Sequence, residues 1–232
     1  MLDSLQLTGR TRSHIMQLDE PRVALHRDAA GPFLAMRKAA AFEGMDLRAA
    51  SGFRDFSSQC AIWRRKFSGE RPLLNAAAEP VERTGLSEDE LIDLILRWSA
   101  LPGASRHHWG SELDLYDAAA LEPGHGVQLV PAEYAAGGPF FGLLQWLEAR
   151  AGEFGFYRPY REDLGGVLPE PWHWSFAPVS VPAQGALTPA LVAEALDGVE
   201  LPGRRALQAR MAALFVSHVL AVAMPDPGTR LA

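Results

Sequence analysis

The sequence predicts an α+β fold, in which a small antiparallel sheet with flanking helices is followed by a C-terminal helical hairpin. The chain has 232 residues, 48% of them hydrophobic and 22% charged, a globular composition long enough for one large domain. Short stretches with strand periodicity alternate with amphipathic stretches at helical spacing. Prolines and a glycine predict a linker at residues 178–185, and the composition changes after it.

In the first half of the chain, apolar residues at helical spacing predict three helices, at residues 32–45, 57–67 and 87–98. Pro32 suits the first turn of the first helix, and the acidic residues after Ser87 suit the start of the third. Residues 47–50 are predicted to form a strand and residues 51–54 a turn. Residues 1–22 and 70–86 are predicted to be irregular. The stretch that carries His14 either reaches back to the cleft or is a frayed end, and we prefer the frayed end.

In the second half, strands are predicted at residues 111–117, 127–130 and 172–176. In the first of these, Leu113 and Leu115 are expected on one face and Asp114 on the other. Helices are predicted at residues 140–152, 188–198 and 204–224, with a loop at 101–110 and a turn or strand at 155–157. The last two helices form the predicted hairpin, residues 187–232, which packs on the core or mediates self-association.

Charge and cysteine content exclude several classes of function. Nucleic-acid binders usually carry a basic face, and the formal net charge of −6 shows no basic character at the level of totals. The single cysteine, Cys60, excludes a disulfide framework and any structural zinc site with two or more cysteines. A metal ion would therefore be held by histidine and carboxylate side chains. We interpret Cys60 as a buried thiol rather than a nucleophile.

No stretch reaches the roughly 18 apolar residues of a membrane helix. Residues 1–16 carry charged side chains and lack the apolar centre of a signal peptide. We therefore expect no transmembrane segment and a cytoplasmic location, or a periplasmic or cell-envelope location if a leader was removed or another export route is used. The oligomeric state stays open.

Two of the seven histidines stand near carboxylates on or beside predicted strands. His107 precedes Asp114 by seven residues, and His173 follows Glu170 by three. A catalytic zinc ion takes three protein ligands from His, Asp and Glu, and a further Glu can deprotonate the water in the fourth position. These residues predict a zinc-dependent hydrolase. In the plainer alternative, His107 caps a loop and His173 fills an aromatic pocket.

Three motifs resemble those of a known family. Residues 105–114, SRHHWGSELD, are similar to the Ser-x-His-x-x-Gly-x-Ala-x-Asp signature of the zinc D-alanyl-D-alanine carboxypeptidases of the VanY and VanX kind, whose wider group includes the hedgehog signalling domain. Residues 170–173, EPWH, resemble the family's Glu-x-Trp-His signature. Residues 51–54, SGFR, followed by Gln59, resemble its Ser-Gly-Tyr-Arg-Ser…Gln segment. All three occur in the family's order, and the resemblance covers roughly residues 23–178.

The resemblance implies a metal centre and a general base. It implies that His107, Asp114 and His173 bind one Zn²⁺ ion per chain. Glu170 would deprotonate a water molecule and then protonate the leaving amine. His108 competes with His107 as a ligand, and we prefer His107 because it fits the signature. His108 would instead support a loop or another group of the site.

The resemblance also implies substrate contacts and an activity. Arg54 would stabilise the oxyanion or the substrate carbonyl, and Gln59 and Ser105 would hold the terminal carboxylate. The implied enzyme is a zinc metallopeptidase, a carboxypeptidase that removes a C-terminal D-alanine from peptidoglycan peptides or precursors. Its domain would span residues 1–186, with a core at 23–178 and the sheet and helices arranged around a zinc cleft.

Four residues depart from the family's pattern: Phe53, Asp55, Trp109 and Glu112. Asp55 either orients Arg54 through a salt bridge or weakens its pull on an anion. Glu112 either supports a residue of the site or lines the cleft. The departures leave four alternatives open: an L,D-carboxypeptidase, a dipeptidase or an endopeptidase acting on muropeptides, and a zinc-stabilised binding module without turnover. The presence of Glu170 favours an enzyme, because a binding module needs no general base.

Aromatic residues and one further histidine lie near these motifs. The aromatic residues are expected to wall the cleft or to fill the core: Trp109, Trp172, Trp174, Phe156 and Tyr157. His125 lies between glycines and is expected in a solvent-exposed loop.

Overall fold

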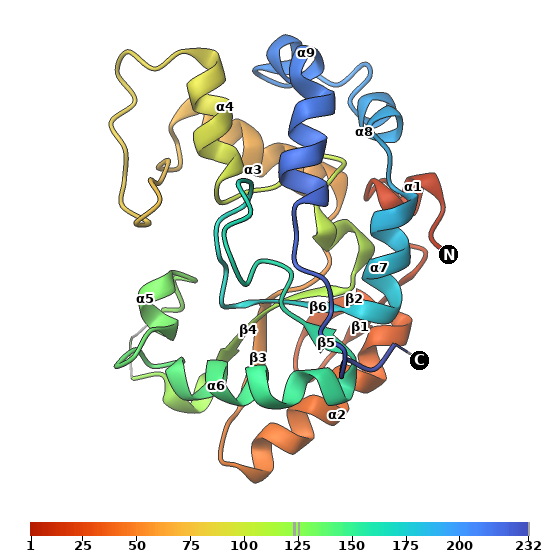
Figure 1. The fold of residues 1–232 in the computed structure, drawn as a ribbon, viewed down its shortest axis with the longest axis vertical. Helices are drawn as coiled ribbons and strands as arrows, with labels where there is room; N and C mark the ends of the chain where they lie inside the picture. The colour runs from red at the N-terminus through yellow and green to blue at the C-terminus, as the bar shows by residue number, and fades with distance from the viewer. Residues whose placement is uncertain (123, 125, 232) are drawn as a thin grey trace.

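The fold is built on a four-stranded antiparallel sheet, which confirms the small antiparallel sheet expected from the sequence (Figure 1). The computed structural model describes residues 1–122, 124 and 126–231. The strands lie in the order β3-β4-β6-β5. Their bounds are Leu47–Ser51 (β3), Glu112–Asp117 (β4), Phe156–Tyr157 (β5) and His173–Phe176 (β6). Asp114 of β4 lies directly opposite His173 of β6, so the register brings two candidate site residues together.

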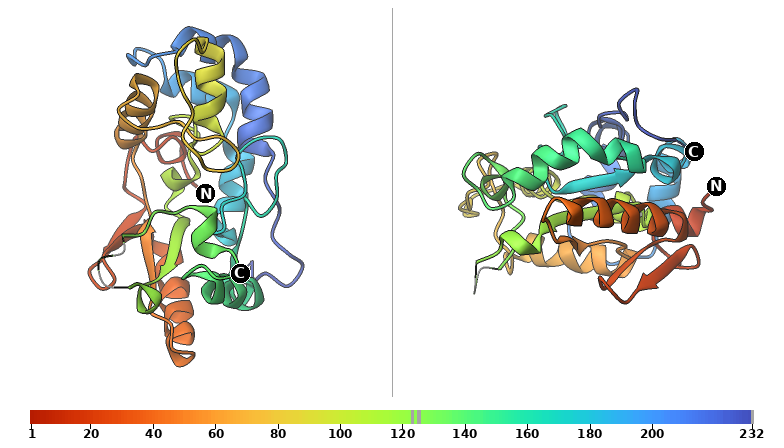
Figure 2. Two further views of the ribbon diagram at one scale, coloured as in Figure 1. Left: turned by 90° about the vertical axis from the view of Figure 1, so that its left-hand side faces the viewer. Right: turned by 90° about the horizontal axis from the view of Figure 1, so that it is seen from below.

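Two helices, α2 (Arg27–Phe42) and α6 (Phe141–Arg150), run side by side along the lower part of the molecule and pack on the sheet (Figures 1 and 2). Leu113 and Leu115 of β4 are fully buried in the core that these elements form. Because side chains alternate along a strand, Asp114 points to the opposite face. The predicted two-faced pattern of this strand is thus confirmed.

A second hydrophobic core forms the upper part of the molecule (Figure 1). It joins helices from distant parts of the chain: α3 (Phe56–Ser68), α4 (Glu88–Leu96), α8 (Pro189–Ala195) and α9 (Arg204–Phe215). Ser87 and Thr188 cap α4 and α8 through their side-chain oxygens. Trp63 of α3 is fully buried, and its indole N–H donates to the carbonyl of Pro202 at 3.0 Å. Helices α8 and α9, the expected hairpin, therefore pack on α3 and α4.

The N-terminal segment is more regular than expected. It contains a short helix, α1 (Ser4–Leu7), and a hairpin of β1 (Ile15–Leu18) and β2 (Val23–His26). His14 is buried, with Nε2 at 3.0 Å from the carbonyl oxygen of His108. The prediction that His14 lies in a frayed end was wrong, because its ring packs against the segment that carries the candidate ligands.

Two predictions that rested on proline were also wrong. Helix α2 begins at Arg27 rather than at Pro32, because the His26 ring caps it by accepting from the backbone N–H of Asp28 at 3.1 Å. Residues 178–185, predicted to be a linker, belong to helix α7 (Ala177–Ala186). Pro178 occupies its first turn, where no backbone N–H is needed, and buried Val179 holds the helix against the sheet core.

Further differences concern short segments. Residues 127–130 form no strand, because Leu129 has a positive φ of 54° and the Glu133 carboxylate accepts its backbone N–H at 2.8 Å. Helix α9 ends at Phe215, and a π-helical turn, Val216–Leu220, follows where the helix was expected to continue to residue 224. Short helices complete the description: η1 (Arg106–Trp109), η2 (Ala118–Ala120), α5 (Pro131–Tyr134) and η3 (Ala151–Phe154). Across the part of the chain described, every helix is too short or too polar to cross a membrane.

Candidate active site

Three candidate ligands from three different elements converge beside the central strands. His107 comes from η1, Asp114 from β4 and His173 from β6. One potential ligand atom from each lies within 4.8 Å of the other two, and all three residues are buried. Nε2 of His107 lies 3.5 Å from Oδ2 of Asp114, and Nδ1 of His173 lies 3.4 Å from Oδ1 of the same carboxylate. Two imidazole groups and one carboxylate are thus close enough together to bind a single metal ion.

The outer nitrogen of each imidazole is held by an acceptor. Nδ1 of His107 lies 2.7 Å from the carbonyl oxygen of Gly52, and Nε2 of His173 lies 2.8 Å from Oε2 of Glu112. Because these partners can only accept, we assign the ring protons to those two nitrogens. The remaining nitrogens face Asp114, and with a metal ion bound they would direct their lone pairs at it, as metal-ligating histidines do.

The electrostatics of the three residues fit a metal ion. Burial lowers the pKa of His107 to about 3, which keeps the ring neutral. Burial also lowers the pKa of His173, but contacts with Asp114, Glu112 and Glu170 outweigh it and raise this pKa well above its usual value. The negative charges of these three carboxylates thus stabilise a positive charge at the position of the imidazole. Moreover, Oδ1 of Asp114 is buried and accepts no hydrogen bond from the described residues. A divalent cation would satisfy both requirements.

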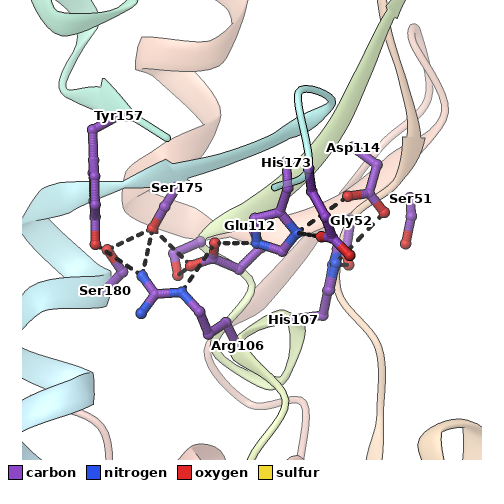
Figure 3. A network of polar contacts seen from close by, with 12 residues as sticks. Ser51, Gly52, Arg106, His107, Glu112, Asp114, Tyr157, His173, Ser175 and Ser180 are labelled. Atoms are coloured by element: carbon purple, nitrogen blue, oxygen red, sulfur yellow. Dashed lines mark hydrogen bonds and ion pairs between the residues drawn. The ribbon is translucent and has the colours of Figure 1, made fainter. Parts of the chain in front are cut away.

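Glu112 is buried behind His173 rather than in the cleft (Figure 3). Its Oε2 lies 3.4 Å from Nε of Arg106, and its Oε1 accepts from Oγ of Ser175 at 2.8 Å. Burial raises the pKa of Glu112, but the charges of Arg106 and the contact with His173 bring it down to about 2. Of the two roles left open for Glu112, the geometry therefore favours support of His173.

Glu170 stands just before β6, at the inner nitrogen of His173. Its Oε2 lies 3.3 Å from Nδ1 of His173, the same nitrogen that faces Asp114. The backbone N–H of Glu170 donates to the carbonyl of Tyr160 at 2.9 Å, which fixes the turn that leads into the strand. A carboxylate is thus placed beside the potential ligand atoms without being one of the three.

Arg54 reaches the cleft from the segment between β3 and α3. Its Nη1 donates to Oε1 of Gln59 at 3.0 Å and its Nη2 to Oγ of Ser51 at 3.2 Å. Burial lowers the pKa of Arg54, while Asp114 and Glu170 act in the opposite direction. An arginine remains charged under such conditions.

Gln59 is fully buried behind Arg54 and is absent from the cleft lining among the described residues. Its side-chain N–H donates to the carbonyl of Ala100 at 2.7 Å. Asp55 caps α3 instead of pairing with Arg54: its Oδ1 accepts from the backbone N–H of Ser58 at 2.7 Å. The structure therefore supports neither expected effect of Asp55 on Arg54 through direct contact.

The candidate ligands, Glu170 and Arg54 open into one cleft of about 540 Å³. Ser105 also lines it, and its Oγ is buried with no hydrogen-bond partner among the described residues. Of the five aromatic residues considered from the sequence, Trp172 lines the cleft, stacked on Trp98 with 6.2 Å between ring centres. Trp109, Trp174, Phe156 and Tyr157 are buried outside the lining.

His108 is buried and turned away from the three candidate ligands. Its Nδ1 lies 2.7 Å from the carbonyl of Arg54, and its Nε2 accepts from the backbone N–H of Gly103 at 3.2 Å. The expectation that His108 supports a loop fits these contacts. His125 lies outside the described residues.

Sequence reasoning missed three cations and two aromatic residues of the lining: Lys66, Arg71, Arg106, Trp98 and Tyr160. A signal for Lys66 was present. It follows Gln59 by seven residues on the same helix, which is two turns and therefore the same face. Arg71 and Trp98 lie in irregular segments, where no periodicity indicates orientation.

The comparison with protein families decides the identity of the fold. The family model VanY, D-alanyl-D-alanine carboxypeptidase, matches residues 22–179. The chain belongs to the VanY family. The enzyme class expected from the sequence, a peptidase of the carboxypeptidase type, is thereby confirmed, and the four-stranded sheet with its cleft is the VanY-like part of the molecule.

The chain is also similar to curated relatives and to solved structures. An uncharacterised protein of Haemophilus influenzae is 33% identical over 122 residues, which is 52% of this chain and 93% of the relative. A second one from the same organism is 38% identical over 98 residues, 41% of this chain and 67% of the relative.

Two solved structures share the fold at 20% identity each. VanYB in complex with D-alanine-D-alanine has a TM-score of 0.51 and matches 83% of this chain and 87% of that chain. A mutant of the vancomycin-resistance D,D-pentapeptidase VanY in complex with Zn(II) has a TM-score of 0.50 and matches 81% and 93%.

Proposed function

We propose that the chain is a zinc-dependent carboxypeptidase that removes a C-terminal D-alanine from peptidoglycan peptides or precursors. The observation that carries the proposal is the position of Glu170. Its carboxylate lies beside the point where His107, Asp114 and His173 converge, yet outside that triad. A general base for a metal-assisted hydrolysis needs this placement. Membership of the VanY family supports the choice of substrate.

His107, Asp114 and His173 would hold the metal ion. Two neutral imidazoles and one carboxylate match the donor set of catalytic zinc sites and leave one net positive charge on the centre. When bound, Zn²⁺ would acidify a water molecule and polarise the substrate carbonyl. The complex of a VanY protein with Zn(II) supports zinc as the metal.

The remaining steps belong to residues of the chain. Glu170 accepts a proton from the attacking water and delivers it to the departing amine, so the base of the first half-reaction is the acid of the second. Arg54 presents its guanidinium to the oxyanion that forms at the scissile carbonyl. Removal of one such stabilising group raises the barrier by about 3 kcal/mol in related chemistry. Gln59 holds Arg54 in place, and the unsatisfied Ser105 hydroxyl donates to the terminal carboxylate.

Mass spectrometry of a muropeptide pool, incubated with zinc-loaded protein, tests the proposal. We expect the loss of one alanine mass from pentapeptides ending in D-Ala-D-Ala, and no loss with Glu170→Gln. Loss of alanine from tetrapeptides alone would indicate an L,D-carboxypeptidase, and loss of a dipeptide or an internal cut would indicate the dipeptidase or endopeptidase alternative. An unchanged pool, with zinc bound, would favour a binding module without turnover.

A further inference from the structure

Two positively charged side chains line the cleft without a carboxylate partner. Lys66 projects from α3, and Arg71 follows that helix. In the part of the chain that the structure describes, neither forms an ion pair. The Lys66 ammonium donates to the carbonyl of Trp98 at 3.2 Å, whereas the exposed Arg71 is held there through its backbone N–H. Both charges therefore remain available to a ligand.

The charge balance of the cleft favours an anion. Among the described residues, four cations line it, Arg54, Lys66, Arg71 and Arg106, against two carboxylates, Asp114 and Glu170. Glu112, buried behind the lining, offsets Arg106. One net positive charge remains even before a divalent metal ion adds two more, although the chain as a whole carries −6. A concave site of this sign attracts negatively charged ligands.

The position of Lys66 is unfavourable for a charge that has no ligand. Burial lowers the pKa of its ammonium to about 8, with Glu170 acting against this and Arg71 and Arg54 adding to it. The group is still protonated at pH 7. A partly desolvated charge without a counter-ion costs free energy, and an anionic ligand would recover that cost.

The helix geometry directs Lys66 toward the reaction centre. Lys66 lies two turns beyond Gln59, or ~10 Å along α3. Side chains lean toward the N-terminus of their helix, so that of Lys66 leans back toward Gln59 and therefore toward Arg54. From this position the Lys66 ammonium can contact a substrate group that lies one or two residues away from a scissile carbonyl held at Arg54.

We propose that Lys66, with Arg71 at the mouth of the cleft, binds a carboxylate of the peptide substrate and makes the enzyme selective for anionic peptides. The inference rests on the proposed peptidase function. The carboxylate is that of the C-terminal residue or that of an acidic side chain next to it. Lys66 is a specificity residue in this scheme, whereas Glu170 and Arg54 act on the reacting atoms.

Three matched synthetic pentapeptides test the proposal. The first ends in D-Ala-D-Ala with a free carboxylate and carries one acidic side chain. The second has a C-terminal amide, and the third has an amide in place of the acidic side chain. Wild type, Lys66→Met and Lys66→Arg are compared by KM and kcat on each peptide, and the melting temperature of each variant is measured.

We expect Lys66→Met to raise KM at least ~10-fold on the first peptide with kcat changed less than about twofold, as for a lost charge-assisted hydrogen bond. Lys66→Arg should keep most of the affinity. If the terminal carboxylate is the ligand, Lys66→Met leaves KM unchanged on the second peptide, which has the C-terminal amide. If the acidic side chain is the ligand, Lys66→Met leaves KM unchanged on the third peptide. Arg71→Met should give a smaller change of the same pattern.

Equal effects of Lys66→Met on all three peptides, or a KM that does not change, would overturn the proposal. Equal effects on all three peptides, together with a lower melting temperature, would show that Lys66 has only the structural role of donating to the carbonyl of Trp98. A binding measurement separates this failure from that of the peptidase function. Zinc-loaded Glu170→Gln should bind the first peptide more tightly than Glu170→Gln/Lys66→Met does, even if wild type cleaves none of the three. Equal affinities would reject the anion subsite.

Discussion

The Glu112 carboxylate lies 2.8 Å from Nε2 of His173, on the side of the ring that faces away from Asp114 (Figure 3). Three hydrogen-bond donors, His173, Ser111 and Ser175, meet its two oxygens, and Arg106 lies 3.4 Å away. Arg106 in turn donates to the hydroxyl groups of Tyr157 and Ser175, at 2.9 Å each. The orientation of one imidazole is thus fixed by a fully buried polar network.

Glu112→Gln should weaken metal binding. The substitution removes the negative charge that orients His173 and makes it more basic, and such changes typically cost 10- to 100-fold in metal affinity. Competition with a chromophoric chelator measures the dissociation constant. Ser180→Ala, which removes a hydroxyl at the far end of the same network, serves as the control and should leave the affinity near that of wild type. An unchanged constant for Glu112→Gln would contradict the supporting role.

Glu170→Gln and His107→Ala should separate catalysis from metal binding. Loss of a general base and acid lowers kcat by about 10²- to 10⁴-fold, and Glu170→Gln should keep its zinc. His107→Ala should lose both, because it removes one of three ligands. Zinc content by elemental analysis and kcat on a D-Ala-D-Ala pentapeptide are the two measurements. A zinc-free but active His107→Ala protein would reject the ligand assignment.

Gln59→Met distinguishes positioning from substrate contact. The side chain holds Arg54 and lies outside the cleft lining, so we expect kcat to fall about tenfold on peptides with either a free or an amidated C-terminus. Zinc content should stay unchanged. A rise in KM confined to the free-acid peptide would instead show that Gln59 contacts the terminal carboxylate, as the family resemblance implied.

His108 should make the fold sensitive to mild acid. Burial lowers its pKa to about 4, and its Nε2 must stay unprotonated to accept from Gly103. An unfolded histidine titrates near pH 6.5, so as the pH falls from about 6.5 to about 4 the unfolded chain takes up a proton that the folded chain refuses. Stability should therefore fall by up to about 3 kcal/mol over this range.

Urea unfolding of chelator-treated protein at a series of pH values measures this dependence. His108→Gln should show a shallower slope by close to one proton, because the remaining histidines are the same in both proteins. Parallel slopes for the two proteins would show that His108 does not control the acid sensitivity.

The sheet and the triad were predictable because their signals are local. Alternation identified β4 and β6, and the spacing of His107, Asp114 and His173 within two motifs identified the converging side chains. The register that sets Asp114 opposite His173 then brings both motifs together.

The features that were missed depend on contacts between distant segments. Pro182 and Gly185 indicate a linker, yet packing of Val179 and the Ser180–Ser175 hydrogen bond hold α7 helical. Likewise, Glu112 was noticed as an unusual residue, but its partner Arg106 became apparent only once η1 placed it beside β4.

Asp114 and His173 lie on strands that pack in the sheet core, whereas Lys66 lies on α3, which packs in the upper core. All three candidate ligands lie within residues 22–179, whereas α3, which carries Lys66, packs on α8 and α9 beyond that stretch. Substitutions in α8 or α9 would therefore move α3, and Lys66 with it, without replacing any of the candidate ligands. Under the proposed role of Lys66, an evolving or redesigned enzyme would change its preferred peptide through the C-terminal helices, with the candidate ligands and Glu170 unchanged.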